Sequence, residues 1–256
     1  MIAIAFLVAI YTAARRADKR GIPSQTIFDL GLYLLISAVV GARIFHVLQH
    51  RDSYESLIDI IGIWRGGLSG LAFYGGFILA LVVGILYLRA KKLSVAEVTD
   101  IIAPSMILGV SIGRIGCFLA GCCFGKPTSL PWGVTFPEES MAWIEIGAQR
   151  VHPTQLYSVV SLFSISIILL ILQKHMKFPG QLFILSILMY SIHRFLIDFL
   201  RYYTPDERIG SLATSQVVSI IAGTSALAVM IFLAVRRSSR AGSVKVSQPK
   251  KMKEKS

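Results

Sequence analysis

Three arginines stand inside long apolar segments of this chain, where charged side chains are rare. They are Arg43, Arg114 and Arg194. An arginine at the centre of a membrane span costs about 2.5–3.5 kcal/mol on insertion scales, and such residues usually face a protein interior or a cavity. A guanidinium group presents a planar fork of donors that suits a phosphate. The three arginines therefore indicate a site for an anion, and a lipid phosphate is the abundant anion near a membrane surface.

Further polar residues are expected at the same depth as these arginines. Asp198 and Arg201 follow Arg194 at helical spacing, so the three side chains share one face of a helix. The others are Tyr74, His152, Gln155, Tyr157 and Tyr190. A simpler interpretation of any single arginine is that its long side chain extends to the membrane surface without binding a ligand. Three arginines on segments that run in the same direction favour a shared site.

The segments that carry these residues are suited to a lipid bilayer. Hydrophobic residues make up 54% of the 256-residue chain and charged residues 16%, whereas soluble domains carry roughly 25% charged residues. This composition argues against a soluble globular protein and against a disordered chain. Apolar runs occur at 1–13, 27–48, 71–88, 101–120, 155–173, 180–200 and 211–235. Because backbone groups in lipid must be paired within their own segment, we expect seven helices in an all-α integral membrane protein.

The first apolar run is short. It spans residues 1–13, whereas a spanning helix needs about 20 residues. It lacks the basic start and the small-residue cleavage site of a signal peptide. We interpret it as a retained first helix that either extends past Ala13 or rests at the outer interface.

The basic residues indicate which side of the membrane each connection faces. Connections on one side carry 17 Lys and Arg residues, eight of them after residue 235, and connections on the other side carry six. Cytoplasmic loops hold the excess of basic residues, so we predict an outside N-terminus and a cytoplasmic C-terminus. Residues 1–235 would form a transmembrane domain of seven helices, and residues 236–256 a basic, disordered tail. The connections 49–70 and 121–153 would form a small outer cap, or interfacial arms at the level of the lipid headgroups.

The net charge of +12 is concentrated beside a membrane helix, at the end of the chain. Such a basic segment is typical of a protein that contacts anionic lipids. We therefore expect the lipid bilayer, and no nucleic acid, as a partner. Tyr202 and Tyr203, after the sixth apolar run, suit an interfacial position.

Small residues surround the second arginine. Glycines that would allow close approach of a helix or a ligand are Gly113, Gly116 and Gly125. The three cysteines are Cys117, Cys122 and Cys123. They leave three alternatives open: small apolar packing residues, a Cys117–Cys122 disulfide facing an oxidising exterior, or functional thiols. No Cys-x-x-Cys pair is present, so no zinc site is predicted.

These residues lie in motifs that resemble those of the prolipoprotein diacylglyceryl transferases, a family of bacterial inner-membrane enzymes. The resemblance runs from Arg15 to the last apolar run. Gly41-Ala42-Arg43 resembles the family's Gly-Gly-Arg, and Gly66-Gly67 with Phe73-Tyr74-Gly75-Gly76 resembles its Gly-Gly and Phe-His-Gly-Gly. Gly113-Arg114-Ile115-Gly116-Cys117-Phe118 through Gly125 resembles its Gly-Arg-Ile-Gly-Asn-Phe-Ile-Asn-Gly-Glu. His152-Pro153-Thr154-Gln155-Leu156-Tyr157 is similar to His-Pro-Ser-Gln-Leu-Tyr, and Tyr190-x3-Arg194-x3-Asp198-x2-Arg201 to Tyr-x3-Arg-x3-Glu-x2-Arg.

The resemblance implies a multi-pass enzyme of the bacterial inner membrane. Such enzymes transfer the diacylglyceryl group of phosphatidylglycerol to the lipobox cysteine thiol in the signal peptide of a preprolipoprotein; a thioether forms and glycerol phosphate leaves. Arg114 would bind the lipid phosphate. The catalytic residues would be Arg194, Tyr74 and His152, and Arg194 would stabilise the departing phosphate. The other substrate-binding residues would be Arg43, Gly113, Gly116, Gly125, Gln155, Tyr190, Asp198 and Arg201. Because the nucleophilic thiol belongs to the substrate, the implied reaction needs no metal or other cofactor.

The chain departs from the family pattern at several positions. Tyr74 replaces a histidine, and a phenol with a pKa near 10 is a poor base at neutral pH. Tyr74 would then donate a hydrogen bond, or His152 would serve as the base. Cys117 and Ala120 replace the two signature asparagines, and Cys122 replaces the glutamate. Two other functions therefore remain open: a non-catalytic paralogue that binds phosphatidylglycerol, and a transporter of an anionic lipid. A transporter would favour inverted repeats and broken helices, which the sequence does not show.

Overall fold

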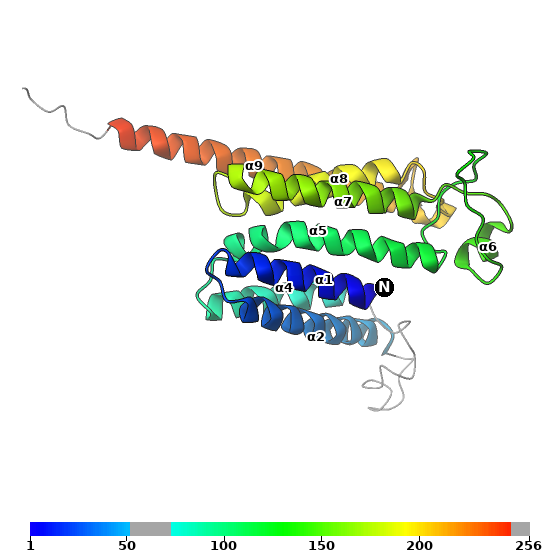
Figure 1. Cartoon of the computed structure of the whole chain (residues 1–256), viewed down its shortest axis with the longest axis horizontal. Coiled ribbons are helices and arrows are strands. Elements are labelled where there is room, and N and C mark those ends of the chain that lie inside the picture. Colours follow the sequence, from blue (N-terminus) through cyan, green and yellow to red (C-terminus); the bar gives the residue numbers. More distant parts are fainter. Residues whose placement is uncertain (52–72, 247–256) are drawn as a thin grey trace, which may run out of the picture. The chain divides into compact units, whose positions relative to one another are not determined.

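The computed structural model describes residues 1–51 and 73–246, and this part of the chain is mostly helical (Figure 1). The helices are α1 (Ile2–Asp18), α2 (Ser24–Gln49), α4 (Phe73–Ala90), α5 (Val95–Leu119), α6 (Met141–Ile146), α7 (Thr154–Leu172), α8 (Gln181–Ile197) and α9 (Thr214–Val246). Two 3-10 turns, η3 (Gln173–His175) and η4 (Pro205–Glu207), and a hairpin of β1 (Arg208–Ile209) and β2 (Leu212–Ala213) complete the described elements. The predicted all-α membrane protein is confirmed.

Four helical segments are long and apolar enough to cross a membrane. They are Ser24–Gln49, Val95–Leu119, Thr154–His175 and Thr214–Arg237. Tyr74–Ala90 and Gln181–Ile197 are shorter apolar helices. Each of the seven apolar runs coincides with a helix, although residues 71 and 72 lie outside the described residues. Most of the predicted 49–70 part of the outer cap, with Gly66-Gly67, also lies outside them.

Several helices extend beyond their apolar runs, because polar residues can begin or continue a helix without being buried in lipid. The first helix continues to Asp18, past the end of its apolar run at Ala13. α5 begins at Val95 because the Ser94 hydroxyl accepts a hydrogen bond from the backbone N–H of Glu97 at 3.4 Å. α9 continues past residue 235 to Val246.

The chain folds as two compact units. Residues 2–109 form the first, here called the N-terminal unit. Met1 and residues 110–256 form the second, the C-terminal unit, and α5 contributes to both. The predicted site residues Arg43 and Tyr74 belong to the N-terminal unit, and all the others belong to the C-terminal unit.

The N-terminal unit has a core of small and branched apolar residues. Ala13, Ala17 and Leu30 are among its buried members. α2 and α4 pack closely because glycines face each other: a Cβ at Gly41 would lie 2.5 Å from the carbonyl oxygen of Gly75. The Gly-Gly segments of the sequence therefore have a packing role here. Arg43 is half-buried on α2, and Tyr74 is 71% exposed at the start of α4.

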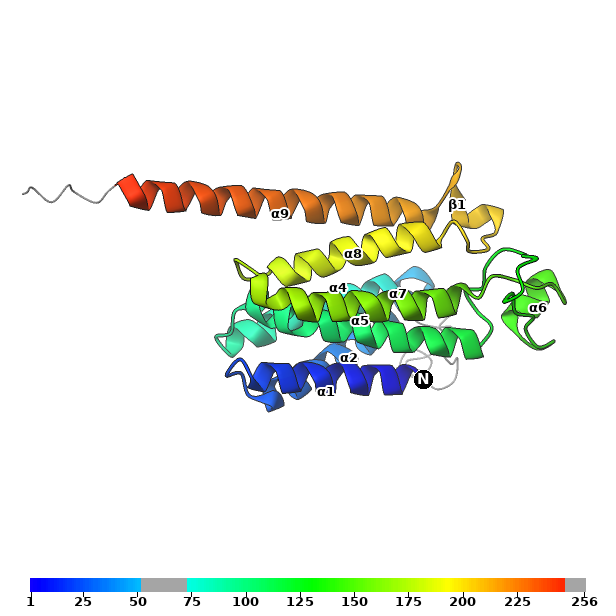
Figure 2. The same cartoon turned by 45° about the horizontal axis from the view of Figure 1, so that its top comes forward.

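The C-terminal unit places α8 against both α7 and α9 (Figure 2). The connection from Gly121 to Pro153 contains α6 and has its own apolar core of Phe124, Phe136, Ala142 and Val151. This connection is tied to the residues that follow α8, since Lys126 N–H donates to the Leu200 carbonyl at 2.8 Å and Tyr202 N–H donates to the Phe124 carbonyl at 3.1 Å. The ends of α5, α7 and α8 are thereby held around one region.

Candidate active site

Asp198, directly after α8, is the centre of a polar cluster. Its side chain is fully buried, and Arg194 Nη1 lies 3.3 Å and Arg201 Nη1 3.9 Å from its Oδ1 atom. The hydroxyl of Tyr203 donates to Oδ1 at 2.7 Å, and the hydroxyl of Ser215 donates to Oδ2 at 2.6 Å. We call these five residues the aspartate cluster. Its three charged members were predicted to share a helix face.

The aspartate cluster holds two positive charges against one negative charge. The side chains of Arg194 and Arg201 stay 16% and 14% exposed, whereas that of Asp198 is fully buried. Arg194 Nη2 also donates to the Tyr203 hydroxyl at 3.2 Å, and the guanidinium carbon of Arg201 lies 4.8 Å from the centre of the Tyr203 ring. The cluster therefore fixes both guanidinium groups and leaves a net positive charge, which suits an anionic ligand.

Sequence reasoning missed two members of this cluster. Tyr203 was expected at a membrane interface, but it bridges Arg194 and Asp198. Burial raises the pKa of Tyr203, so its hydroxyl stays protonated as a donor at neutral pH. Ser215 comes from the first turn of α9, and its contact with Asp198 joins residues 17 positions apart. No local pattern could have indicated that contact.

Arg114 lies on α5 and faces α8. Its guanidinium group is hydrogen-bonded to the Tyr190 hydroxyl and lies within electrostatic range of Cys117 and Cys123. Tyr190 stands four residues before Arg194, one helical turn away. The structure thus brings Arg114, Tyr190 and Arg194 into one neighbourhood.

His193, which directly precedes Arg194 on α8, belongs to the same neighbourhood. Its side chain is buried, and its Nδ1 atom lies 2.8 Å from the Ser161 hydroxyl on α7. The imidazole is within electrostatic range of both Arg114 and Arg194. Neighbouring residues point about 100° apart on a helix, but α8 is packed on more than one side, so both directions lie inside the unit.

His152 and Gln155 stand where the long connection enters α7. His152 Nδ1 lies 3.4 Å from the Tyr157 hydroxyl, which accepts a hydrogen bond from Trp132 Nε1 at 2.8 Å. Gln155 is 1% exposed and donates from Nε2 to the Cys122 carbonyl at 2.8 Å. Its Oε1 atom has no hydrogen-bond partner among the described residues. Gln155 therefore positions the cysteine segment.

The three predicted glycines differ in their surroundings. A Cβ at Gly125 would lie 2.6 Å from the His152 carbonyl oxygen and 2.8 Å from that of Leu200, so three chain segments meet there. A Cβ at Gly116 would lie 2.9 Å from the Cβ of Met1. A Cβ at Gly113, next to Arg114, would meet no described atom within 4 Å. Packing alone explains glycine at position 125, and it does not explain glycine at position 113.

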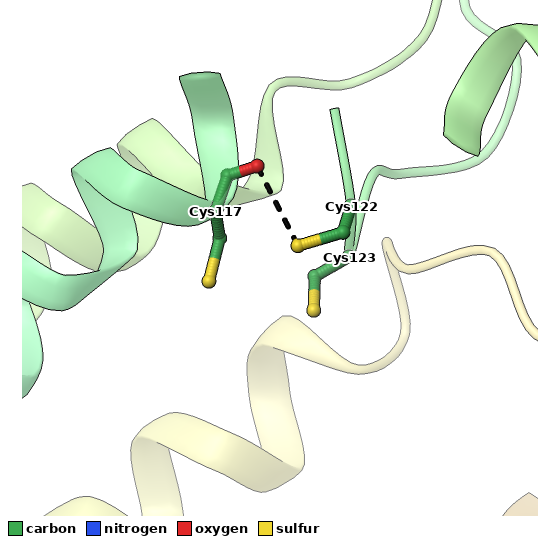
Figure 3. Close-up of side chains that lie close together, drawn as sticks. All are labelled: Cys117, Cys122 and Cys123. Carbon is green, nitrogen blue, oxygen red and sulfur yellow. Dashed lines mark hydrogen bonds between the residues drawn. The ribbon is translucent and has the colours of Figure 1, made fainter. Parts of the chain in front are cut away.

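The three cysteines gather in one place (Figure 3). Two of them, Cys117 and Cys123, lie within electrostatic range of Arg114. The three sulfur atoms all lie within 4.8 Å of one another, and all three thiols are free, so the Cys117–Cys122 disulfide is not formed. We call them the cysteine cluster. Burial raises the pKa of the Cys122 thiol to about 12. The turn that brings them together contains two residues with left-handed backbone, Gly121 at φ 64° and Cys123 at φ 60°.

An open cavity lies between α7 and α8. Its volume is about 620 Å³, within the range of small-molecule sites. The lining is mostly apolar, with Ile165, Met189 and Leu196, and its polar members include Tyr157, Ser161 and His193. Through His193, this apolar cavity adjoins the neighbourhood of Arg114 and Arg194.

The fold and these groups define an all-α membrane protein with a cationic site beside an apolar cavity, the combination that an anionic amphiphile requires. Comparison with known families narrows this class. The family described as prolipoprotein diacylglyceryl transferase matches residues 1–232, and the chain belongs to that family.

Curated relatives in this family carry the name phosphatidylglycerol–prolipoprotein diacylglyceryl transferase. The Clostridium tetani protein is 33% identical over 220 residues, covering 86% of this chain and 86% of the relative. The Finegoldia magna protein is 36% identical over 222 residues, covering 86% and 84%. The Thermosynechococcus vestitus protein is 34% identical over 227 residues, covering 87% and 82%.

Proposed function

We propose that this protein transfers the diacylglyceryl group of phosphatidylglycerol to the lipobox cysteine thiol of preprolipoproteins, with formation of a thioether and release of glycerol phosphate. The family match over residues 1–232 and the names of the relatives support this reaction. One structural observation supports this reaction for this chain: Arg114 and Arg194 lie in the same neighbourhood. Tyr190 is hydrogen-bonded to Arg114, and Asp198 forms an ion pair with Arg194.

Arg114 binds the lipid phosphate in this proposal. Its guanidinium group has Tyr190 as a hydrogen-bond partner, and further N–H groups remain for phosphate oxygens. Gly113, which has open space where a side chain would be, allows the lipid headgroup to approach the backbone beside Arg114.

Arg194 stabilises the phosphate as it departs. As the carbon–oxygen bond to the glyceryl group breaks, negative charge grows on the phosphate oxygen, and a fixed cation lowers the energy of that state. Asp198 and Tyr203 hold the guanidinium group in place, so little reorganisation accompanies the reaction. Arg201, paired to the same carboxylate, supplies the second positive charge.

The proton of the substrate thiol requires an acceptor. His152 is the residue we propose for it, because histidine is the side chain that most often acts as a general base in enzymes. Its Nδ1 atom is held near the Tyr157 hydroxyl. Arg43 and Tyr74, in the N-terminal unit, are retained as substrate-site residues on the basis of the motifs that contain them.

The bilayer supplies the lipid and orients the site. We propose seven spans, with an outside N-terminus, a cytoplasmic C-terminus and the arginines toward the outer leaflet of the bacterial inner membrane. The asymmetry of the basic residues supports this orientation. The cavity between α7 and α8 would hold an acyl chain, because its lining is mostly apolar. Residues 236–256 would act as a cytoplasmic extension that catalysis does not need.

Complementation tests the proposal. A bacterium depleted of its own transferase is supplied with this chain, and the modified cysteine of a model lipoprotein is identified by mass. The proposal predicts growth and a diacylglyceryl adduct, and both should be lost in Arg114→Ala and Arg194→Ala at normal expression. Binding of phosphatidylglycerol without any adduct would instead indicate a non-catalytic paralogue. Movement of the lipid between leaflets without an adduct would indicate a transporter.

A further inference from the structure

We infer that Cys117, Cys122 and Cys123 form a three-thiolate site for a soft divalent cation of the zinc class, with a fourth coordination position for the substrate thiol. The role of the fourth position rests on the proposed function, whereas the cation site itself does not. These are the only three cysteines of the chain. Although they do not form a Cys-x-x-Cys pair, the fold brings their sulfur atoms to one place (Figure 3).

The sulfur positions are close to what such a cation requires. With metal–sulfur distances of about 2.3 Å, three thiolates around one zinc lie about 3.8–4.0 Å apart. The sulfur atoms of the cysteine cluster all lie within 4.8 Å of one another. The widest pair must therefore close by at most about 1 Å, which a small rotation about the Cα–Cβ bonds can provide.

The backbone of the cluster is held before any ligand binds. Cys122 N–H donates to the Cys117 carbonyl at 3.1 Å. The carbonyls of Cys122 and Cys123 accept from Gln155 Nε2 and Thr154 Oγ1, both at 2.8 Å. These bonds engage the backbone carbonyls of all three cysteines. The Cys122 thiol also donates to the Cys117 carbonyl at 3.6 Å, a long hydrogen bond that it would give up on binding a cation.

The surrounding charge favours a divalent cation. Three thiolates and one divalent cation carry a net charge of −1, and the Arg114 guanidinium lies within electrostatic range of Cys117 and Cys123. A monovalent cation would leave a larger negative charge. Soft thiolate ligands select zinc-class ions over magnesium or calcium. The half-buried cysteines are more accessible than residues that only fill a core.

A zinc site with three protein ligands typically keeps its fourth position for water or substrate. A thiol that coordinates the metal loses its proton, and here that proton passes to His152, the acceptor proposed above. The metal-bound thiolate would then form the sulfur–carbon bond while the carbon–oxygen bond to phosphate breaks, and the bonding electron pair leaves with the phosphate. The oxidation state of the metal is unchanged. Arg114, the proposed phosphate ligand, lies beside the cysteines, so thiol and phosphate would meet there.

Cobalt(II), a spectroscopic substitute for zinc, tests the cation site. The reduced, metal-free full-length protein in detergent is titrated with Co²⁺ while the sulfur-to-cobalt charge-transfer absorption is recorded. We expect saturation at one ion per chain with the intensity of three thiolates. Each single Cys→Ser variant should lose about one third of the intensity and bind at least tenfold more weakly, since one of the three sulfur ligands is gone. His175→Gln, remote in sequence in η3, is the control and should bind as the wild type does.

Two further results would overturn the cation site. One is the absence of a sulfur-to-cobalt band in the wild-type protein. The other is a band that persists when all three cysteines are replaced by serine. Formation of a disulfide on purification counts against the site as well, if reduction does not restore binding.

A lipobox peptide tests the fourth position. Added to the cobalt-loaded protein, a peptide with its cysteine should raise the charge-transfer intensity by about one third, as three sulfur ligands become four. The same peptide with serine in place of cysteine should leave it unchanged. Equal spectra with both peptides would overturn the role of the fourth position. Lipid transfer at full rate by metal-free protein would overturn that role while leaving the proposed function intact. A loaded protein that takes up the cysteine peptide and transfers no lipid would refute the proposed function alone.

Discussion

The aspartate cluster and the cysteine cluster lie in the same unit, but their polar groups are satisfied to different degrees. Asp198 is fully buried and meets two guanidinium groups and two hydroxyl donors. In the cysteine cluster the backbone is hydrogen-bonded and none of the three thiols forms a disulfide, and the Cys122 thiol donates only a long hydrogen bond to the Cys117 carbonyl at 3.6 Å. Groups that are already paired fix geometry, and groups with bonding capacity left can take a ligand. We therefore assign a positioning role to the first cluster and a binding role to the second.

Replacement of Arg114, which lies within electrostatic range of the cysteine cluster, should have the largest effect on the transfer rate. Its replacement by alanine removes the proposed phosphate ligand without breaking an ion pair in the part of the chain that the structure describes, so the fold should persist. We expect about a 10²–10³-fold loss of transfer rate, the size typical of a lost charge-stabilising donor. The assay is transfer from phosphatidylglycerol to a lipobox peptide by purified protein. Arg208→Ala, at an exposed position in the hairpin, is the control and should leave the rate unchanged. Equal rates for wild type and Arg114→Ala would remove Arg114 from the mechanism.

Asp198→Ala should affect stability more than any surface change. It leaves two partly buried guanidinium groups without their shared carboxylate, and breaking a buried ion pair costs about 3–5 kcal/mol. Thermal unfolding in detergent measures the loss. The matched control is Asp206→Ala, an exposed aspartate in η4. If the two variants unfold at the same temperature, the aspartate cluster has no positioning role.

Two glycine substitutions separate packing from ligand binding. Gly125→Ala forces a Cβ against the backbone oxygens of His152 and Leu200, and overpacking of this kind costs about 1–3 kcal/mol. Gly113→Ala meets no described atom within 4 Å and should not lower the melting temperature. We expect Gly113→Ala to weaken phosphatidylglycerol binding, as judged by a titration with the lipid. A stable Gly113→Ala protein with unaltered lipid binding would show that the headgroup does not approach this position.

Replacement of Tyr203 by phenylalanine should have a smaller effect on stability, and that effect should depend on pH. Burial raises its pKa above the ordinary value near 10, so the folded state keeps a proton that the unfolded state releases. The stability from this residue is therefore complete below about pH 10 and is lost as the pH rises through the folded-state pKa. The melting temperature should fall more steeply above pH 10 in the wild type than in Tyr203→Phe. Parallel pH profiles would contradict the buried donor.

Much of the helical fold and part of the site could be predicted from local patterns. The apolar runs fall on helices because backbone pairing in lipid leaves few alternatives. The spacing of Arg194, Asp198 and Arg201 indicates that their side chains lie close together, and they meet at the end of α8. The positions of the helix ends are predicted less accurately than the helices themselves, because polar residues such as Ser94 can begin a helix outside the apolar run.

The remaining site residues depend on contacts between distant segments. Ser215 reaches Asp198 from α9, and His193 meets Ser161 of α7. The cysteine cluster depends on left-handed backbone at Gly121 and Cys123, which no spacing rule for cysteines contains. The replacement of a signature asparagine and a glutamate by Cys117 and Cys122 was the one available signal, since it put two thiols into a motif that carries chemistry.

Headgroup discrimination tests the role of the arginines most directly. The purified protein is titrated with phosphatidylglycerol and, separately, with a diacylglycerol that has the same acyl chains and no phosphate. If Arg114 and Arg194 bind the phosphate, the wild type should bind phosphatidylglycerol at least tenfold more tightly than the diacylglycerol. The Arg114→Ala variant should bind the two lipids with equal affinity. Equal affinity of the wild type for the two lipids would contradict the account.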